Sequence, residues 1–510
     1  MADVGVLIAS ILAALSLVWF LLLRRRREGE PPVENGWIPY LGCALAFSAN
    51  PLKFLQTYQK KYGDTFTCKI AGNFITFITD PFSYSSVIRH GKYLDFQNFG
   101  IKVSRRVFDH VDFNDAKYGV DYEEIHQIFN KTLQGSALGP LAASMMENLQ
   151  FVISQIKSSL DSDGWITGWL NEFSFRIMFE AGFLTLFGKN EKAMAAMDIE
   201  KVNAQHAAIL TAMENFKVFD ASFPALVGGI PVLFLKAAKE SRLALAQMLV
   251  SKILNRNDNK SLLIEERMNL LDRSPTLDDL DKAKTHVAML WASQANTVPA
   301  SFWSIYYLLR CPEALKAVRN EIDDLLRITN QKIGDANNPV IFTREQLESM
   351  RVMGSLINEA LRLSSTSIML RVATENFALT LDSDVKVAVR KGDLICLYPQ
   401  QLHLDPDIYE DPLEFKYDRF LDENGKEKTA FYKNGRKLKH YLLPFGSGVS
   451  ICPGRFFAIN EIKQFLSILL CYFDMELSDP SGPIPPQDNS RSGLGILQPA
   501  HDVQFRYRLK

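Results

Sequence analysis

A glycine-rich loop that carries one cysteine and leads directly into a helix is the feature that most constrains the fold. The segment FGSGVSICPG begins at Phe445, and residues 455–472 follow with the apolar spacing of an amphipathic helix. At a helix start, Cys452 faces unpaired backbone N–H groups and the positive end of the helix dipole, which favour the metal-binding thiolate. Three glycines leave space for a large flat group near the backbone, namely Gly446, Gly448 and Gly454. Because a lone cysteine is otherwise most often a buried structural residue, the surrounding pattern decides its role.

The cysteine content and the charge balance argue against several kinds of site. The six cysteines among 510 residues are scattered and include no CxxC pair. This argues against structural zinc and against a disulfide framework, and it is typical of a reducing compartment. The formal net charge of -1 gives no support for nucleic-acid binding.

The N-terminus predicts a membrane anchor. Residues 4–23 form a nearly unbroken apolar run without a charge, and about 20 such residues cross a bilayer as a helix. Four arginines follow at 24–27, and the positive-inside rule keeps them in the cytosol together with the globular part. A cleaved signal peptide would have a shorter apolar region, with its charges before the run. We therefore predict an anchor over residues 1–27, a proline-rich linker over 28–50 and one domain over 51–510.

The periodicity of the rest predicts a mainly α-helical domain with a smaller β-sheet region, an α+β arrangement. Alternating residues predict strands in five places, at 65–70, 74–79, 377–381, 385–389 and 394–397, the first two as a hairpin. Residues 278–310 predict one long, mostly apolar and therefore buried helix. Between residues 91 and 121 no period holds, and we expect a long irregular loop whose aromatic side chains contact substrate.

The cysteine loop has the pattern Phe-x-x-Gly-x-x-x-Cys-x-Gly and follows a helix that contains Glu-x-x-Arg. Together these motifs resemble the haem-thiolate monooxygenases of the cytochrome P-450 family. The resemblance implies the cytochrome P-450 fold, haem b as cofactor, and Cys452 as the axial ligand of the iron, a thiolate that promotes O–O cleavage. The other residues that it places at the haem are Phe445, Gly448, Gly454 and Arg371, the last on a propionate. Most members have Arg or His where this chain has Ser450, which predicts one weakened haem contact.

Glu359 and Arg362 lie three residues apart and share one face of a predicted helix. Taken alone, they predict a solvated ion pair that contributes about 0–1 kcal/mol. The resemblance implies instead a buried structural network behind the haem, completed by Arg419 in the segment FKYDRF.

The predicted long helix contains the polar segment WASQANTVP, which begins at Trp291. Pro299 cannot donate to the carbonyl of Ala295, so the helix kinks there and an acceptor is freed. The family uses a Thr and an acid in this segment to deliver protons to dioxygen. In one alignment Asn296 replaces the Thr, and in the other Asn296 replaces the acid while Thr297 matches. Neither register has a carboxylate, and we expect a water held by Asn296 or Thr297 to deliver the protons instead. The alternative is that the segment is only a helix kink whose polar side chains are satisfied by hydrogen bonds.

Longer stretches resemble one branch of the family, the sterol 7α-hydroxylases, among them 131–135, 144–149, 173–188 and 397–400. They are more similar to members that act on cholesterol, in bile-acid synthesis, than to members that act on oxysterols. A rigid sterol needs an apolar cleft with a few polar groups that fix its orientation. The candidate substrate contacts are Trp291, Asn296, Ser365 and Leu494.

The resemblance also implies electrons from NADPH through a membrane-bound NADPH–cytochrome reductase. It implies a single-pass protein of the endoplasmic reticulum membrane, in contact with lipid and with its catalytic domain in the cytosol. Basic residues near the cysteine loop are candidates for docking the reductase: Lys433, Arg436, Lys437, Lys439 and Lys463. Two other functions stay open, an isomerase like prostacyclin synthase, which needs neither O₂ nor NADPH, and a haem protein that only binds or transports sterol.

Overall fold

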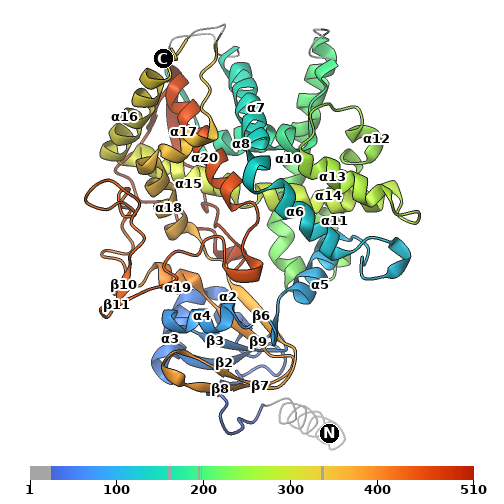
Figure 1. The fold of residues 1–510 in the computed structure, drawn as a ribbon, viewed down its shortest axis with the longest axis vertical. Coiled ribbons are helices and arrows are strands. Elements are labelled where there is room, and N and C mark those ends of the chain that lie inside the picture. The colour runs from blue at the N-terminus through green and yellow to red at the C-terminus, as the bar shows by residue number, and fades with distance from the viewer. Residues whose placement is uncertain (1–23, 159, 161–163, 193–195, 197, 335–337) are drawn as a thin grey trace, which may run out of the picture.

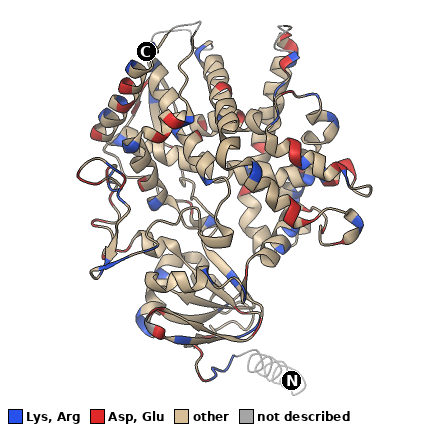
Figure 2. Cartoon of the chain, in the orientation of Figure 1, with Lys and Arg blue, Asp and Glu red and all other residues tan. Residues whose placement is uncertain are grey.

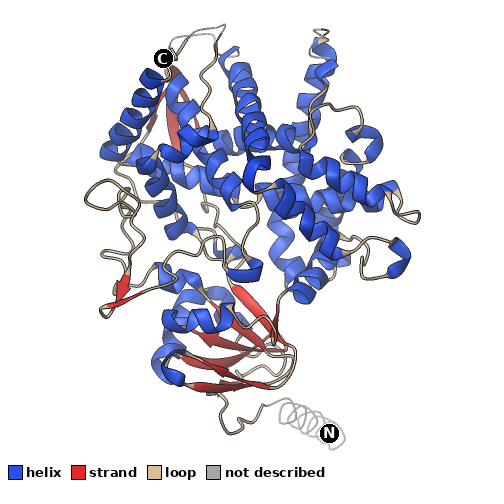
Figure 3. Cartoon of the chain, in the orientation of Figure 1, coloured by secondary structure: helices blue, strands red, loops and turns tan. Residues whose placement is uncertain are grey.

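The computed structural model describes residues 24–510 apart from 159, 161–163, 193–195, 197 and 335–337. The apolar run over residues 4–23 lies outside this part, so the predicted anchor is not described. Within the described residues, no helix combines the length and the apolar character that a membrane crossing requires. The chain forms a smaller lobe with the largest sheet and a larger helical lobe (Figure 1). Helices dominate and the sheets are small, which confirms the predicted α+β class (Figure 3).

The largest sheet has six strands in the order β1-β2-β3-β9-β6-β4. They are β1 (Val33–Glu34), β2 (Thr65–Ile70), β3 (Asn73–Ile78), β9 (Leu394–Leu397), β6 (Met369–Ala373) and β4 (Leu94–Asp95). Strands β2 and β3 pair antiparallel, which confirms the predicted hairpin. Residues 28–50, predicted as a linker, contribute strand β1, which pairs with β2, and helix α2 (Ala44–Ala49). Helices α3 (Pro51–Tyr62) and α4 (Tyr84–Ile88) complete this lobe (Figure 1).

The larger lobe is built on one apolar core. Its central helix is α15 (Thr297–Arg310), in which every residue except the last is buried. Around it pack α8 (Leu170–Phe187), α18 (Arg351–Ser364) and α20 (Arg455–Tyr472). The other helices of this lobe are α5 (Gln97–Phe108), α6 (Tyr122–Thr132), α7 (Leu138–Ser158), α10 (Ile199–Val227), α11 (Lys236–Met248), α12 (Ser251–Leu254), α13 (Leu262–Asp272), α14 (Asp279–Gln294), α16 (Pro312–Ile328) and α17 (Arg344–Ser349).

Three small sheets complete the described structure. Strands β12 (Phe473–Leu477), β13 (Gln504–Leu509) and β5 (Ile166–Trp169) form one. Strands β7 (Phe377–Thr380) and β8 (Lys386–Val389), both predicted as strands, pair to form another. The third is β10 (Tyr432–Lys433) with β11 (Arg436–Lys437). Helix α19 (Pro399–His403) connects the large sheet to the segment that leads to the cysteine loop.

Two predicted elements are wrong. The stretch 91–121 is not an irregular loop, because it contains β4 and the amphipathic helix α5, which ends at Asp109 in the left-handed conformation. The stretch 278–310 is not one helix, because α14 ends at Gln294 and α15 begins at Thr297. Ala295 and Asn296 between them keep right-handed helical backbone angles, so the helix is interrupted for two residues at the predicted kink.

The arginines that follow the apolar run are partly built into the domain. Arg24 is buried and forms ion pairs with Asp393 (2.5 Å) and Glu30 (3.4 Å). Glu30 also pairs with Arg390. Burial alone would raise the pKa of Glu30, but hydrogen bonds from Arg390 and from the backbone of Arg27, with the charges of Arg24 and Arg390, lower it to about 2. These contacts fix the chain against the sheet immediately after the predicted anchor.

Candidate active site

The cysteine loop is closed by its own backbone. The amide of Cys452 donates to the carbonyl of Phe445 (2.9 Å), and Arg455 donates from Nη1 to the carbonyl of Cys452 (3.0 Å). Gly454 caps α20. Burial raises the pKa of the Cys452 thiol, and the N–H groups of Gly454 and Arg455 counteract this only in part. The N–H groups at the helix start therefore favour the thiolate, as the sequence predicts, while burial favours the thiol.

The structure explains the glycines of the cysteine loop in different ways. Gly446 and Gly448 both adopt positive φ, where other residues are strained. A Cβ on Gly448 would lie 2.7 Å from Cγ2 of Ile88 and 3.2 Å from its carbonyl oxygen. A Cβ on Gly454 would lie 4.0 Å from the Cys452 sulfur, an ordinary contact distance. Gly448 is thus required by the close approach of α4, a constraint that the sequence pattern did not reveal.

Arg371 lies beside the cysteine loop, where the resemblance placed it. It is buried on β6 and donates from Nη2 to the hydroxyl of Ser450 (2.7 Å) and to the carbonyl of Ser447 (3.5 Å). Its guanidinium also lies 5.5 Å from the centre of the Phe96 ring. Ser450, the departure from the family pattern, is therefore the residue that orients this arginine.

The donor set of this loop fits a haem. Among the described residues, no group of three or more His, Cys, Asp and Glu side chains is arranged to hold a metal ion. A single thiolate suits a metal that brings its other ligands with it, as iron in a porphyrin does. The buried Arg371 guanidinium beside the loop supplies a positive charge for an acidic edge of such a group. The residues present are therefore compatible with haem ligated by Cys452.

The second motif forms the predicted buried network. Arg362 makes two hydrogen bonds to the Glu359 carboxylate, at 2.8 and 2.9 Å, and Arg419 donates to the same carboxylate at 2.9 Å. Glu359 and Arg362 are fully buried. Arg362 also donates to the carbonyls of His403 (2.6 Å) and Pro412 (2.7 Å), which fixes α18 to the segment before the cysteine loop. The three residues thus form a shielded structural unit rather than a solvated ion pair.

Asn296 occupies the break between α14 and α15, and its side chain reaches across to the C-terminal loop. Its Oδ1 accepts a hydrogen bond from the amide of Ile496 (2.9 Å). Gly495 passes so close, with φ +145°, that a Cβ there would overlap Oδ1 of Asn296. The Nδ2 group of Asn296 is then the end of the side chain that can hold a water or a substrate oxygen.

The segment between α14 and α15 has no carboxyl group, but a neighbouring helix supplies one. Glu461 of α20 is buried, and burial raises its pKa to about 8, although a hydrogen bond with the side chain of Thr297 opposes this rise. The carboxyl is therefore mostly protonated at neutral pH. Sequence reasoning missed Glu461, because the polar residues Asn460, Lys463 and Gln464 beside it give it the appearance of an ordinary surface acid.

The other candidate substrate residues are brought together by the C-terminal loop. Ser365 forms a β-bridge with Ile496, and its buried hydroxyl has no partner among the described residues. Leu494 packs against the main core. The ring of Trp291 stacks on Phe223 with centroids 3.8 Å apart, and its Nε1 donates to Asp220 (2.8 Å). Asp220 and its partner Arg491 were not foreseen, because an isolated arginine in a coil segment gives no sequence signal.

The basic residues proposed for docking do not form one free cluster. Lys463 is buried and donates to the carbonyls of Leu347 (2.7 Å) and Met350 (2.9 Å), so its assignment to a docking surface is wrong. Lys433 is paired with Asp405, and Arg436 is paired with Asp382. Charged groups of both signs are distributed over the view in Figure 2.

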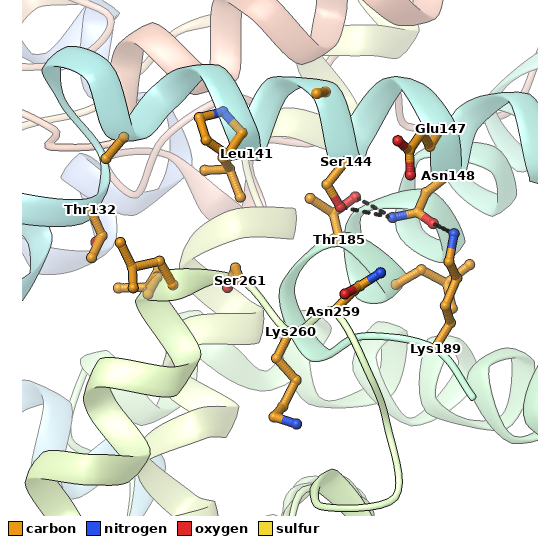
Figure 4. Close-up of a pocket in the computed structure, with 16 residues that line it drawn as sticks. Thr132, Leu141, Ser144, Glu147, Asn148, Thr185, Lys189, Asn259, Lys260 and Ser261 are labelled. Atoms are coloured by element: carbon orange, nitrogen blue, oxygen red, sulfur yellow. Dashed lines mark hydrogen bonds between the residues drawn. The ribbon is translucent and has the colours of Figure 1, made fainter. Parts of the chain in front are cut away.

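A separate hollow lies on the helical lobe, with a volume of about 420 Å³. It lies between α7, α8 and the segment that leads into α13, and Ser144, Asn148, Thr185 and Lys189 line it (Figure 4). Asn148 donates to Thr185 (3.1 Å) and accepts from Lys189 (3.5 Å). None of the lining residues belongs to the cysteine loop or to the candidate substrate contacts, so this hollow is not the active site.

Comparison with known proteins supplies the remaining evidence. The family model described as "Cytochrome P450" matches residues 31–505. The chain is 50% identical to the protein named cholesterol 7-alpha-monooxygenase of Cricetulus griseus, over 97% of this chain and 96% of that protein. It is 40% identical to cytochrome P450 7B1 of Mus musculus, over 100% of this chain and 96% of that protein. It is 37% identical to the 7-alpha-hydroxycholest-4-en-3-one 12-alpha-hydroxylase of Homo sapiens, over 96% of this chain and 95% of that protein.

Proposed function

This chain belongs to the cytochrome P450 family of haem-thiolate monooxygenases, and from that premise we propose that it hydroxylates cholesterol at the 7α position. The observation that supports cholesterol as the substrate is the decrease in sequence identity among the three relatives. Identity is 50% to the cholesterol 7-alpha-monooxygenase, 40% to cytochrome P450 7B1 and 37% to the 12-alpha-hydroxylase. All three alignments cover nearly the whole chain, so the gradient does not come from one shared segment. This reaction would place the enzyme at a step of bile-acid synthesis.

In this proposal Cys452 ligates the haem iron, and Arg371, oriented by Ser450, holds a propionate. Phe445, Gly448 and Gly454 shape the loop that carries the ligand. When bound, haem b supplies the oxygen-activating chemistry, with electrons from NADPH delivered through a reductase. The protein residues bind the sterol, orient one C–H bond and supply protons.

Asn296 and Thr297 are the proposed catalytic residues. Oδ1 of Asn296 is held by the Ile496 amide, which directs its Nδ2–H groups toward a water or a substrate oxygen. The side chain of Thr297 interacts with the carboxyl of Glu461, whose raised pKa of about 8 keeps a proton on it at neutral pH. A hydroxyl that is linked to a protonated carboxyl can pass a proton on and be reprotonated. Glu461 thus takes the place of the acid that the broken helix lacks.

We propose that residues 4–23 attach the enzyme to the endoplasmic reticulum membrane, with the domain in the cytosol. For the reductase, Lys437 and Lys439 are the two residues of the basic set that are exposed and form no ion pair among the described residues. Charge reversal of both lysines should slow NADPH-dependent turnover while leaving sterol binding unchanged. Unchanged turnover would exclude this docking surface.

The test is reconstitution with NADPH, reductase and an equal mixture of cholesterol and a side-chain oxysterol, with the products identified by mass spectrometry. We expect NADPH-dependent 7α-hydroxycholesterol as the main product. Product from the oxysterol alone would assign the protein to oxysterol hydroxylation. Conversion of a substrate without NADPH and reductase would support an isomerase, and sterol binding without any product would support a sterol-binding haem protein.

A further inference from the structure

A buried ion pair lies beside the candidate substrate residues and has no part in the proton chemistry. Asp220 of α10 and Arg491 of the C-terminal loop are 2% and 3% exposed, and their side chains are in direct contact through Oδ2 and Nη1. Trp291 donates to the other carboxylate oxygen (2.8 Å), and Gln498 donates weakly to Oδ2 (3.5 Å). Both oxygens of Asp220 are therefore occupied, and its position is fixed from three sides.

Arg491 is only partly satisfied by this arrangement. Its Nε and Nη2 atoms are buried and have no acceptor among the described residues. Together these two atoms carry three N–H bonds. Buried polar groups are almost always hydrogen-bonded, and leaving charged donors unpaired is especially unfavourable. The free donors therefore require an acceptor from outside the described protein atoms, either a water or a ligand oxygen.

The surroundings of the pair favour a ligand with one oxygen on an apolar body. The stacked rings of Trp291 and Phe223 form an apolar wall next to Asp220. The carbonyl of Arg491 accepts from the amide of Leu494 (3.0 Å), so the arginine belongs to the same short loop as the candidate substrate contact. Apolar walls with one or two convergent polar groups are the usual form of a site that binds and orients a small molecule.

The proposed substrate limits which oxygen can be recognised. Cholesterol carries a single oxygen atom, the ring-A hydroxyl. That hydroxyl oxygen is therefore the only acceptor that this ligand can offer to the free donors of Arg491.

We propose that Nε and Nη2 of Arg491 donate hydrogen bonds to the ring-A hydroxyl oxygen of the sterol, with Asp220 and Trp291 holding the guanidinium in place. This inference rests on the proposed sterol function and names the polar contact that orients the substrate. Arg491 is then a specificity-determining binding residue that touches substrate.

The test first changes the ligand and leaves the holoenzyme intact. Dissociation constants are measured from the substrate-induced haem spectrum for cholesterol, for cholest-5-ene without the 3-hydroxyl, and for a cholestene whose only hydroxyl is on the side chain. We expect cholesterol to bind about 10- to 100-fold more tightly than the other two, the range for a hydrogen bond to a charged group. Equal affinities for cholesterol and cholest-5-ene would mean that water satisfies Arg491, and would overturn the inference while leaving the sterol function intact.

The second part changes the protein. The double variant Asp220→Asn/Arg491→Gln removes both charges together and leaves no buried charge without a partner. We expect it to bind cholest-5-ene as the unaltered enzyme does and to lose the preference for cholesterol. The control is Arg344→Gln/Glu348→Gln, an exposed ion pair on α17, which should keep the preference. A preference that survives in the first double variant would overturn the inference, and failure of every sterol to bind would overturn the proposed function with it.

Discussion

The substitution Gly495→Ala tests whether the contact between the C-terminal loop and the helix break is as tight as the structure indicates. A Cβ at this position overlaps Oδ1 of Asn296, and the residue has φ +145°, a region that residues with a side chain rarely adopt. Displacing Asn296 removes its hydrogen bond with the Ile496 amide, about 0.5–1.5 kcal/mol. The backbone strain adds about 1–3 kcal/mol. We therefore expect a loss of about 1.5–4.5 kcal/mol in the free energy of unfolding.

The assay is denaturant unfolding of the holoenzyme, with Gly425→Ala as the matched control. Gly425 also has positive φ, at +67°, but a Cβ there meets nothing within 4 Å. The control should therefore lose only the strain of the left-handed conformation, about 1–2 kcal/mol. Adding Asn296→Ala to Gly495→Ala removes the overlapping atom, and the double variant should be about 1–2 kcal/mol more stable than the sum of the single losses. Strict additivity, or equal losses for the two glycine variants, would refute the close approach.

Three further predictions follow from individual contacts. Cys452→Ala should abolish the thiolate-type carbon monoxide spectrum in a folded protein, and an unchanged spectrum would exclude Cys452 as the ligand. Glu359→Gln leaves Arg362 and Arg419 without their shared carboxylate and should cost about 3–5 kcal/mol in unfolding free energy, against less than about 0.5 kcal/mol for the exposed Glu348→Gln. Because the pKa of Glu30 is lowered from 4.5 to about 2, its ion pairs stabilise the fold fully above pH 4.5 and are lost as the pH falls toward 2. The stability difference between the unaltered protein and Glu30→Gln should thus be largest at pH 7 and disappear near pH 2, and a difference independent of pH would refute this origin.

The sequence predicted those parts of the site whose signal is local. The loop that leads into α20, the hairpin β2–β3 and the helix that carries Glu359 and Arg362 each depend on residues within a short window, and the structure contains all three. The spacing of Glu359 and Arg362 alone predicted a solvated ion pair, and only the resemblance indicated that the pair is buried. Arg371 was placed by family resemblance, and the structure brings it to Ser450 although 79 residues separate them. Helix α5 was missed because Gly100 and two consecutive arginines obscure its period.

Contacts between distant segments could not be predicted. Asn296 and Ile496 are 200 residues apart, and Asp220 and Arg491 are 271 residues apart. No periodic pattern links such positions, so the sequence identified Asn296 as a candidate without indicating its partner, and gave no signal for Asp220 or Arg491. The same holds for Glu461, whose raised pKa results from burial by the tertiary packing around α20. Sequence therefore indicated the cofactor ligand, Asn296 and Thr297, whereas Glu461, Asp220 and Arg491 required the fold.

The C-terminal loop links these unpredicted contacts into one rigid unit. Beyond Asn296, Trp303 of α15 donates to the carbonyl of Leu497 (2.6 Å), and the amide of Leu497 donates to Ser364 (3.0 Å). The amide of Thr366 donates to the carbonyl of Gly495 (2.8 Å). A loop tied at so many points to α15 and to the end of α18 cannot adapt to each ligand without breaking several buried hydrogen bonds. Discrimination between sterols should then depend on which ligand oxygen meets fixed donors, and Arg491, immediately before the tied segment, is held where such a fixed donor is needed.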